Sequence, residues 1–245
     1  MVKSKSVAIL AEMGTGKTLI SIGIAGYLYL QKEINKLLIV APLSITKVWE
    51  EEFAKFADFE YQAKVLEGSS KKKNEELKNL FGNKLQVAII NYESCWRMEK
   101  EIADWKPDMI ICDESSKIKN PQAKQSKALH RLGKISKHNI ILTGTPVTNT
   151  PLDFFSQYKF LDENIFGGSY YSFRARYAVM GGYGNHQVVG YKNLQELTEK
   201  AHKIAFRITK KEQNTRKRSL DKIFHVDSTI YISVSKQSPT GKEGV

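Results

Sequence analysis

One segment of the chain carries the residue types that bind the phosphates of a nucleotide. Residues 11–18 read Ala-Glu-Met-Gly-Thr-Gly-Lys-Thr, which matches the P-loop pattern G-x-x-x-x-G-K-[ST] except that Ala11 stands at the first glycine position. An apolar run precedes the segment and a helical pattern follows it, as a phosphate loop requires. The nucleotide-binding residues that we predict are Glu12, Met13, Gly14, Thr15, Gly16, Lys17 and Thr18.

The residues of this loop have separate tasks. Gly14 and Gly16 let backbone N–H groups approach phosphate oxygens, and the N-terminus of the following helix attracts anions. Lys17 is long enough to reach the β- and γ-phosphates, and the hydroxyl of Thr18 is a ligand for Mg²⁺. The segment therefore predicts binding of ATP together with Mg²⁺.

A pair of acids supplies the second half of such a site. Asp113 and Glu114 follow the apolar run 109–112, and ligands of open parallel sheets bind beyond the carboxyl ends of the strands. We expect Asp113 to hold Mg²⁺ together with Thr18, and Glu114 to orient or deprotonate the attacking water. The catalytic residues that we predict are Lys17, Asp113 and Glu114.

The elements that must position these residues alternate between strand and helix. Apolar runs of strand length indicate strands, and apolar residues at helical spacing indicate helices. Predicted strands are 6–11, 37–41, 61–66, 85–91, 107–113 and 139–143, and predicted helices are 18–30, 45–56, 71–81, 122–132, 152–161 and 193–204. This alternation is typical of an α/β fold with a mainly parallel central sheet that helices cover on both faces.

The alternation fades after residue 165. Turn-forming residues between two short β-like runs predict a small hairpin insert near 178–190. Residues 223–234 alternate between apolar and polar, as in a half-buried strand, and 235–245 are typical of a frayed tail.

Composition favours a soluble chain that meets a polyanion. The 245 residues carry a formal net charge of +12, and basic residues gather in 190–222. Nucleic acid is therefore a candidate partner, and a solvated lysine-rich surface is the alternative. No apolar run approaches the roughly 18 residues of a membrane span, and no secretory signal opens the sequence. Cys95 and Cys112 lack a C-x-x-C partner and suit two reduced core thiols.

Three motifs occur in a characteristic order: the phosphate loop, Asp-Glu-Ser-Ser at 113–116, and Leu-Thr-Gly-Thr-Pro at 142–146. Further matching segments are 41–44 with Trp49 and Phe53, 91–93, 117–120, Asn149, and the basic run 206–211. Together these motifs resemble the Swi/Snf-like ATPases of helicase superfamily two over roughly residues 7–211. The acidic motif departs from the family's Asp-Glu-Ala-His and related forms at Ser116.

This resemblance implies a RecA-like P-loop lobe, 1–211, whose ATP hydrolysis is stimulated by duplex DNA and drives movement along it. The basic segment 212–245 would lead towards a second RecA-like lobe, which we expect in the full protein or in a partner chain and not among these residues. That lobe supplies arginines to the ATP site, so we expect weak turnover without it. Residues expected to couple the ATP site to DNA are Ser116, Thr143 and Thr145. Residues expected to contact the DNA backbone are Pro42, Ser44, Asn91, Tyr92, Lys117 and Lys119.

Two other interpretations stay open. The chain can be a nucleotide-gated DNA-binding module that needs a separate partner chain. A P-loop kinase for a small molecule is more distant, because the segments 117–120 and 143–146 argue against it. We expect a location in the cytoplasm, at the nucleoid, for a bacterial or phage-encoded protein, and in the nucleus for a eukaryotic one.

Overall fold

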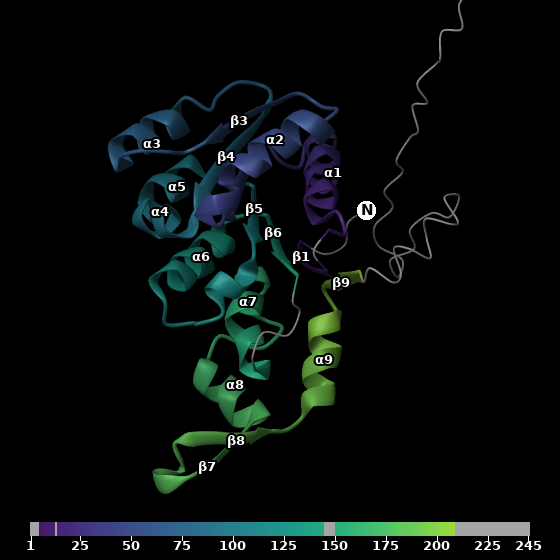
Figure 1. Ribbon diagram of the computed structural model, residues 1–245, viewed down its shortest axis with the longest axis vertical. Coiled ribbons are helices and arrows are strands. Elements are labelled where there is room, and N and C mark those ends of the chain that lie inside the picture. Colours follow the sequence, from purple (N-terminus) through teal and green to yellow (C-terminus); the bar gives the residue numbers. More distant parts are fainter. Residues whose placement is uncertain (1–4, 13, 145–149, 209–245) are drawn as a thin grey trace, which may run out of the picture.

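A sheet of seven parallel strands runs through the part of the chain that the structure describes (Figure 1). The computed structural model describes residues 5–12, 14–144 and 150–208. In chain order the strands are β1 (Ser6–Ala11), β2 (Lys36–Ala41), β3 (Tyr61–Val65), β4 (Leu85–Asn91), β5 (Met109–Asp113), β6 (His138–Thr143) and β9 (Ala205–Ile208). Their order in space is β3-β4-β2-β5-β6-β1-β9.

Helices cover both faces of this sheet, because alternate residues of each central strand point to opposite sides. In β2, Leu37 and Ile39 pack with α1 (Lys17–Leu30) and α2 (Thr46–Phe56), whereas Leu38 and Val40 pack with the helices of the other face. Those helices are α3 (Ser70–Lys78), α4 (Tyr92–Arg97), α5 (Glu99–Trp105), α6 (Lys124–Ile135) and α7 (Phe154–Leu161). Burial on both faces explains why the central strands are apolar at consecutive positions.

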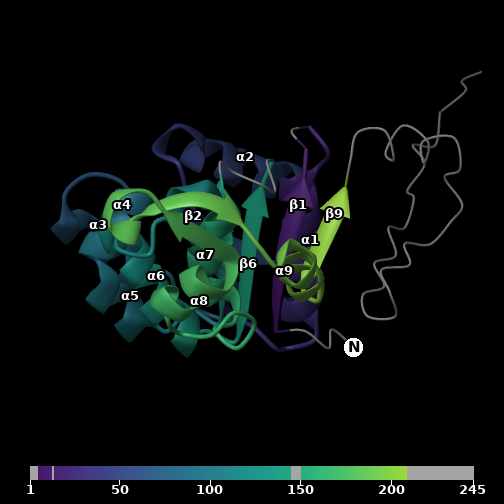
Figure 2. The same cartoon turned by 90° about the horizontal axis from the view of Figure 1, so that it is seen from below.

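The register of the sheet brings the carboxyl ends of the central strands to one edge. Figure 2 shows β6, β1 and β9 side by side, with their arrowheads pointing the same way. Partners across the sheet at this edge are Ala41 with Asn91, Asp113 with Leu142, and Thr143 with Leu10. The segments that follow β4, β2, β5, β6 and β1 therefore emerge next to one another, in that order.

A smaller aromatic unit extends the fold at the lower end of Figure 1. Helix α8 (Tyr170–Tyr177) leads into the antiparallel hairpin of β7 (Ala178–Gly181) and β8 (Gln187–Tyr191). Helix α9 (Leu194–His202) then returns the chain to β9, beside β1. Phe155, Phe173, Tyr177 and Leu197 form the core of this unit. The hairpin predicted near 178–190 is confirmed.

The structure also contains elements that the sequence patterns did not predict. Helices α4 and α5 span 92–97 and 99–105, and strand β9 lies where only a basic run was recognised. Four short 3₁₀ turns complete the described elements: η1 (Leu43–Ile45), η2 (Ser115–Ile118), η3 (Pro151–Asp153) and η4 (Tyr183–Asn185). None of the described helices is long and apolar enough to cross a membrane. The strand predicted at 223–234 and the tail at 235–245 lie outside the described residues.

Candidate active site

The phosphate loop joins β1 to α1, and its glycines adopt a conformation that other residues rarely adopt. Gly14 has a φ of 80°, and Gly16, the residue that caps α1, has a φ of 80° and a ψ of 29°. Both lie in the left-handed region, where a Cβ atom is unfavourable. The buried side chain of Thr15 closes the turn, because its Oγ1 donates a hydrogen bond to the carbonyl oxygen of Glu12 at 2.6 Å. Met13 lies outside the described residues.

Lys17 folds back across this loop. Its Nζ donates to the carbonyl oxygen of Ala11 at 2.9 Å and lies 3.4 Å from that of Glu12. Burial raises the pKa of the carboxyl groups of Asp113 and Glu114, and the positive charge of Lys17 counteracts part of that rise for both acids. A phosphate group carries the kind of oxygen that Lys17 already contacts. We therefore expect Lys17 to exchange these carbonyl oxygens for phosphate oxygens when nucleotide binds.

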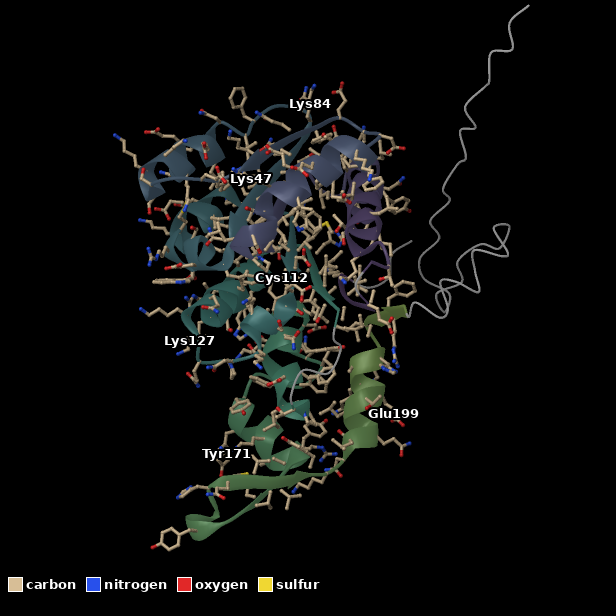
Figure 3. All side chains as sticks on the ribbon, in the orientation of Figure 1. Lys47, Lys84, Cys112, Lys127, Tyr171 and Glu199 are labelled. Atoms are coloured by element: carbon tan, nitrogen blue, oxygen red, sulfur yellow. The ribbon has the colours of Figure 1, made fainter. Side chains whose placement is uncertain are left out.

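Asp113 is the last residue of β5 and is only 7% exposed. Its Oδ2 accepts a hydrogen bond from Nε1 of Trp49 at 2.9 Å, and its Oδ1 accepts one from the backbone N–H of Glu114 at 2.9 Å. Burial raises the pKa of the Asp113 carboxyl, and these two hydrogen bonds and the charge of Lys17 counteract only part of that effect. Figure 3 shows how central the site is, because Cys112, the residue before Asp113, lies near the middle of the folded part.

Glu114 stands beside Asp113 with a φ of 52°, so its backbone turns sharply away from the strand. Its side chain is half-buried. Burial raises its pKa, and the neighbouring charge of Asp113 adds to the rise, while Lys17 and Lys117 lower it. A carboxylate of raised pKa is a better proton acceptor near neutral pH, which suits the predicted role of Glu114 towards a water molecule.

The residues present fit a magnesium ion. Mg²⁺ prefers hard oxygen ligands and is usually held by one or two protein groups together with substrate phosphates. Asp113 offers a carboxylate in which each oxygen accepts one hydrogen bond from the described residues, which leaves a lone pair on each oxygen for a metal ion. Thr18 offers a hydroxyl from the first turn of α1, at the same edge of the sheet. Asp113 and Thr18 are therefore the residues that would hold the ion.

Of the three predicted coupling residues, the structure describes Thr143 and Ser116. Strand β6 separates β5 from β1, and Thr143 at its carboxyl end is 2% exposed. Ser116 lies in η2, where its Oγ is 3.5 Å from the carbonyl oxygen of Glu114. Thr145 lies outside the described residues. Both described residues are thus near the acid pair, while their coupling role stays a prediction.

Three predicted DNA contacts follow β2 and β4, on the other side of the acid pair. Ser44 is exposed in η1, and Pro42, the residue before that turn, is half-buried. Asn91 caps α4, because its Oδ1 accepts the backbone N–H of Ser94 at 2.9 Å. All three lie at the edge of the sheet that carries the acid pair, as expected.

Two lysines that follow the acidic motif are also predicted DNA contacts. Lys117 is exposed in η2, and Lys119 is half-buried with its Nζ 3.8 Å from Oδ2 of Asp153. Lys117 can therefore meet a phosphate directly, whereas Lys119 would have to leave or share its partner Asp153.

The predicted DNA contact of Tyr92 falls on a residue whose side chain lies inward in this structure. Tyr92 is 7% exposed, and its hydroxyl donates to the carbonyl oxygen of Asp113 at 2.7 Å. Burial, first of all, raises the pKa of its phenol well above the usual value. Its place as the first residue of α4 turns it inward, while Asn91 stays at the surface. Tyr92 therefore belongs to the support of the acid pair.

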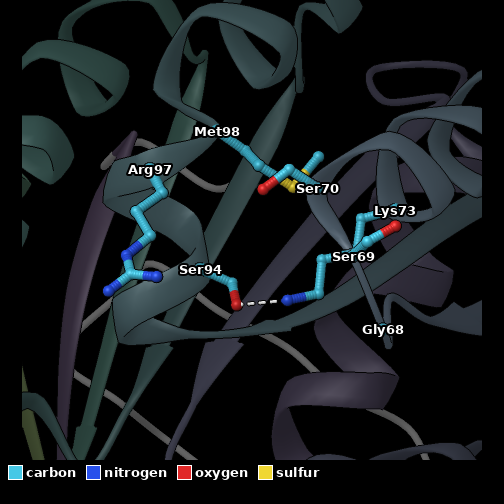
Figure 4. Close-up of a pocket in the computed structure, with 7 residues that line it drawn as sticks. All are labelled: Gly68, Ser69, Ser70, Lys73, Ser94, Arg97 and Met98. Carbon is cyan, nitrogen blue, oxygen red and sulfur yellow. Dashed lines mark hydrogen bonds between the residues drawn. The ribbon is translucent and has the colours of Figure 1, made fainter.

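Sequence reasoning missed a basic cleft close to Asn91. The cleft has a volume of about 190 Å³, and Figure 4 shows Lys73 and Arg97 among the side chains that line it. Nζ of Lys73 donates to Oγ of Ser94 at 2.6 Å, and Ser69 caps the N-terminus of α3. The signal was present in the sequence, because Gly-Ser-Ser at 68–70 precedes three lysines at the start of a helix. The sequence analysis predicted a helix at 71–81 but assigned no binding role to it.

Comparisons with known proteins agree with this arrangement. The model of the SNF2-related domain matches residues 2–237. DNA repair and recombination protein RAD54B of Homo sapiens is 38% identical over 168 residues, which is 65% of this chain and 18% of that protein. The ISWI chromatin-remodeling complex ATPase ISW1 of Saccharomyces cerevisiae is 33% identical over 167 residues, 67% of this chain and 14% of that protein. The chain thus spans less than a fifth of either relative.

Among solved structures, the SWI2/SNF2 ATPase core of Sulfolobus solfataricus in complex with dsDNA is similar to this chain. The TM-score is 0.68 at 28% sequence identity, and the match covers 85% of this chain and 41% of that one. The likeness therefore extends over most of this chain. With the phosphate loop, the acid pair and the family model in agreement, the chain belongs to the SNF2-related domain family.

Proposed function

We propose that this chain is the ATP-binding lobe of a DNA-dependent ATPase that moves along duplex DNA. The observation that carries the proposal is the order of segments along one edge of the sheet. The phosphate loop follows β1, Thr143 ends β6, the acid pair stands at the end of β5, and the predicted DNA contacts Pro42, Ser44 and Asn91 stand at the ends of β2 and β4. A nucleotide at one end of this row and DNA at the other would share the acid pair between them.

The chemistry is hydrolysis of the bond between the β- and γ-phosphates. The loop glycines and Lys17 hold the phosphates, and Glu114 aligns a water molecule and accepts its proton as the oxygen attacks the γ-phosphorus. Mg²⁺, held by Asp113 and Thr18, would neutralise negative charge on the phosphate oxygens. ADP leaves with the electrons of the broken bond, and the products are ADP and inorganic phosphate.

Duplex DNA is the proposed partner, through its phosphates. The similar Sulfolobus core was solved with dsDNA, and the basic cleft of Lys73 and Arg97 lies next to Asn91 in this chain. Contacts of lysine and arginine to phosphates position a protein on DNA without reading its sequence. We therefore infer binding to duplexes of any sequence.

Full turnover is proposed to need a second RecA-like lobe, in the same protein or a partner chain. The match covers 41% of the similar ATPase core, so most of such a core is contributed by other residues. An arginine supplied across the site contributes about 10³–10⁵ in rate in phosphoryl transfer. We therefore expect this chain alone to hydrolyse ATP slowly, with some stimulation by DNA.

The DNA half of the proposal is tested by binding of a labelled duplex, measured by fluorescence anisotropy at several salt concentrations. Lys73→Ala should weaken binding for every duplex sequence and reduce the slope of log affinity against log salt by about one. Lys84→Ala is the matched control, because Lys84 is exposed just before β4, at the opposite edge of the sheet.

If the wild type and Lys73→Ala bind duplex DNA with equal affinity, the cleft is not part of the DNA-binding site. ATP turnover, measured with and without duplex DNA, then separates a DNA-dependent motor from a nucleotide-gated DNA-binding module. Stimulation by DNA supports the motor, and DNA binding without any turnover, even with a second lobe added, would leave a nucleotide-gated binding module.

A further inference from the structure

Two aromatic side chains from separate elements hold Asp113. Trp49 lies in α2 and is 1% exposed, and Tyr92 begins α4 and is 7% exposed. Nε1 of Trp49 donates to the carboxylate at 2.9 Å, and the hydroxyl of Tyr92 donates to the backbone carbonyl of the same residue at 2.7 Å. One bond thus fixes the side chain of Asp113 and the other fixes its backbone.

Each of these elements starts at a predicted DNA contact. Helix α2 directly follows η1, which carries Ser44, and α4 directly follows Asn91, which caps it. Strands β2 and β4, which precede these segments, are neighbours in the sheet, and β2 also borders β5. A displacement of either DNA-side segment therefore reaches Asp113 through a single aromatic side chain.

Aromatic rings suit this task because they are rigid. A tryptophan or tyrosine side chain turns about only two torsions, and both rings are packed in the core, so they cannot lengthen to follow a moving helix. A hydrogen bond prefers an angle above about 150° at its hydrogen and weakens steeply below about 120°. A small rotation of α2 or α4 would therefore change the bonds to Asp113 instead of being absorbed.

We propose that Trp49 and Tyr92 are positioning residues that hold Asp113 in its metal-binding orientation and make that orientation depend on DNA contacts at Ser44 and Asn91. This inference rests on the proposed function, because it assigns a path between two sites that the proposed function requires. It differs from an ordinary core role, in which a buried tryptophan or tyrosine merely satisfies its polar atom.

The test measures binding of ADP to the full chain by calorimetry, in Mg²⁺ and in EDTA, with and without duplex DNA. Trp49→Phe removes the indole N–H, and Tyr92→Phe removes the hydroxyl. The chain offers a matched control for each variant. Trp105→Phe alters a buried indole whose Nε1 has no hydrogen-bond partner among the described residues, and Tyr158→Phe alters a buried hydroxyl that donates to Ala201 at 3.1 Å.

Groups that orient a metal ligand typically contribute 10–100-fold to metal affinity. Trp49→Phe should therefore reduce the gain in ADP affinity that Mg²⁺ provides by about 10-fold, and should leave the affinity in EDTA unchanged. Tyr92→Phe should bring the factor by which DNA changes ADP affinity closer to one. Trp105→Phe and Tyr158→Phe should keep the wild-type values of both quantities.

Three results would overturn the inference. The first is a Trp49→Phe chain that binds ADP in Mg²⁺ as tightly as the wild type does. The second is a Trp49→Phe chain that loses the same factor in ADP affinity in Mg²⁺ and in EDTA, because such a loss indicates a merely structural role. The third is a Tyr92→Phe chain in which duplex DNA changes the affinity for ADP by the same factor as in the wild type. If circular dichroism shows that Trp49→Phe does not fold, the Tyr92→Phe measurement alone tests the inference. A wild-type chain that binds no ADP would instead remove the proposed function, and the inference with it.

Discussion

Asp113 combines a chemical role with a cost to folding. Its carboxyl group is buried, so its pKa in the folded chain is raised above the usual value of 3.8. The folded state therefore keeps a proton over a pH range in which the unfolded chain has released it. Stability then falls as the pH rises from about 4 through the raised pKa. An ionised carboxylate at this position is what the proposed magnesium ion would require.

We accordingly expect Asp113→Asn to flatten the fall of the unfolding free energy as the pH rises above 4. The neutral amide cannot ionise, although it can still accept the hydrogen bond from Trp49. Urea denaturation at a series of pH values measures this slope. The same variant should lose ATP hydrolysis, because an amide is a poor ligand for Mg²⁺.

Asp108→Asn provides the control of opposite sign. Burial raises the pKa of Asp108, but Lys137 and the backbone N–H groups of Asn35 and Lys36 lower it further, so the net pKa falls below 3.8. Its ionised form thus adds stability that is lost as the pH falls through that pKa. If Asp113→Asn left the slope unchanged, or changed it in the same sense as Asp108→Asn, the burial argument would fail.

At the scale of elements, the start of α1 decides whether the phosphate loop can form. Gly16 caps this helix in the left-handed conformation, and no atom of the described residues, its chain neighbours and the helix's own backbone aside, lies within 4 Å of the position that a Cβ would take. Space is therefore available, and only the backbone conformation forbids a larger residue.

Gly16→Ala should lower the unfolding free energy by about 1–2 kcal/mol, the cost of the left-handed region, and should weaken nucleotide binding. Gly23→Ala, in the interior of the same helix and also free of close atoms, should instead stabilise the chain by up to about 1 kcal/mol. Chemical denaturation of both variants measures the difference. A Gly16→Ala chain as stable as Gly23→Ala would contradict the role of the positive φ.

The elements that could be predicted from the sequence are those with a complete pattern. The strands 37–41 and 85–91 are apolar at nearly every position, and the structure places both within the central sheet. Helices α4 and α5 have six and seven residues, too few to display two full turns of apolar spacing. Strand β9 was missed because its partner β1 stabilises it from nearly 200 residues away, which no local pattern records.

The same reasoning explains what was found at the site. The residues of the phosphate loop and the acid pair could be recognised because their types and spacing are dictated by phosphate and metal chemistry. The inward turn of Tyr92 and the cleft around Lys73 could not, since they depend on how α3 and α4 pack. A surface role was assigned to Tyr92 because the sequence places it directly after Asn91, whose side chain does remain at the surface.

On the scale of the whole molecule, the sheet acts as a rigid frame that fixes the order of the functional segments. Parallel strands bring the following segments to the same edge, and the strand order β4-β2-β5-β6-β1 places the predicted DNA contacts, the acid pair and the phosphate loop in a row. The net charge of +12 adds a long-range attraction for DNA that needs no particular contact. The proposed roles of all these segments depend on binding of nucleotide phosphates by the loop after β1.

The most direct measurement of that assignment is calorimetric binding of Mg²⁺–ATP to the wild type, Lys17→Ala and Lys84→Ala. Lys17 should turn from the carbonyl oxygens of Ala11 and Glu12 to the phosphates, so its removal should abolish measurable binding. Lys84→Ala removes an equal charge at the opposite edge of the sheet and should bind as the wild type does. Binding that survives in Lys17→Ala, or that falls equally in both variants, would contradict the account.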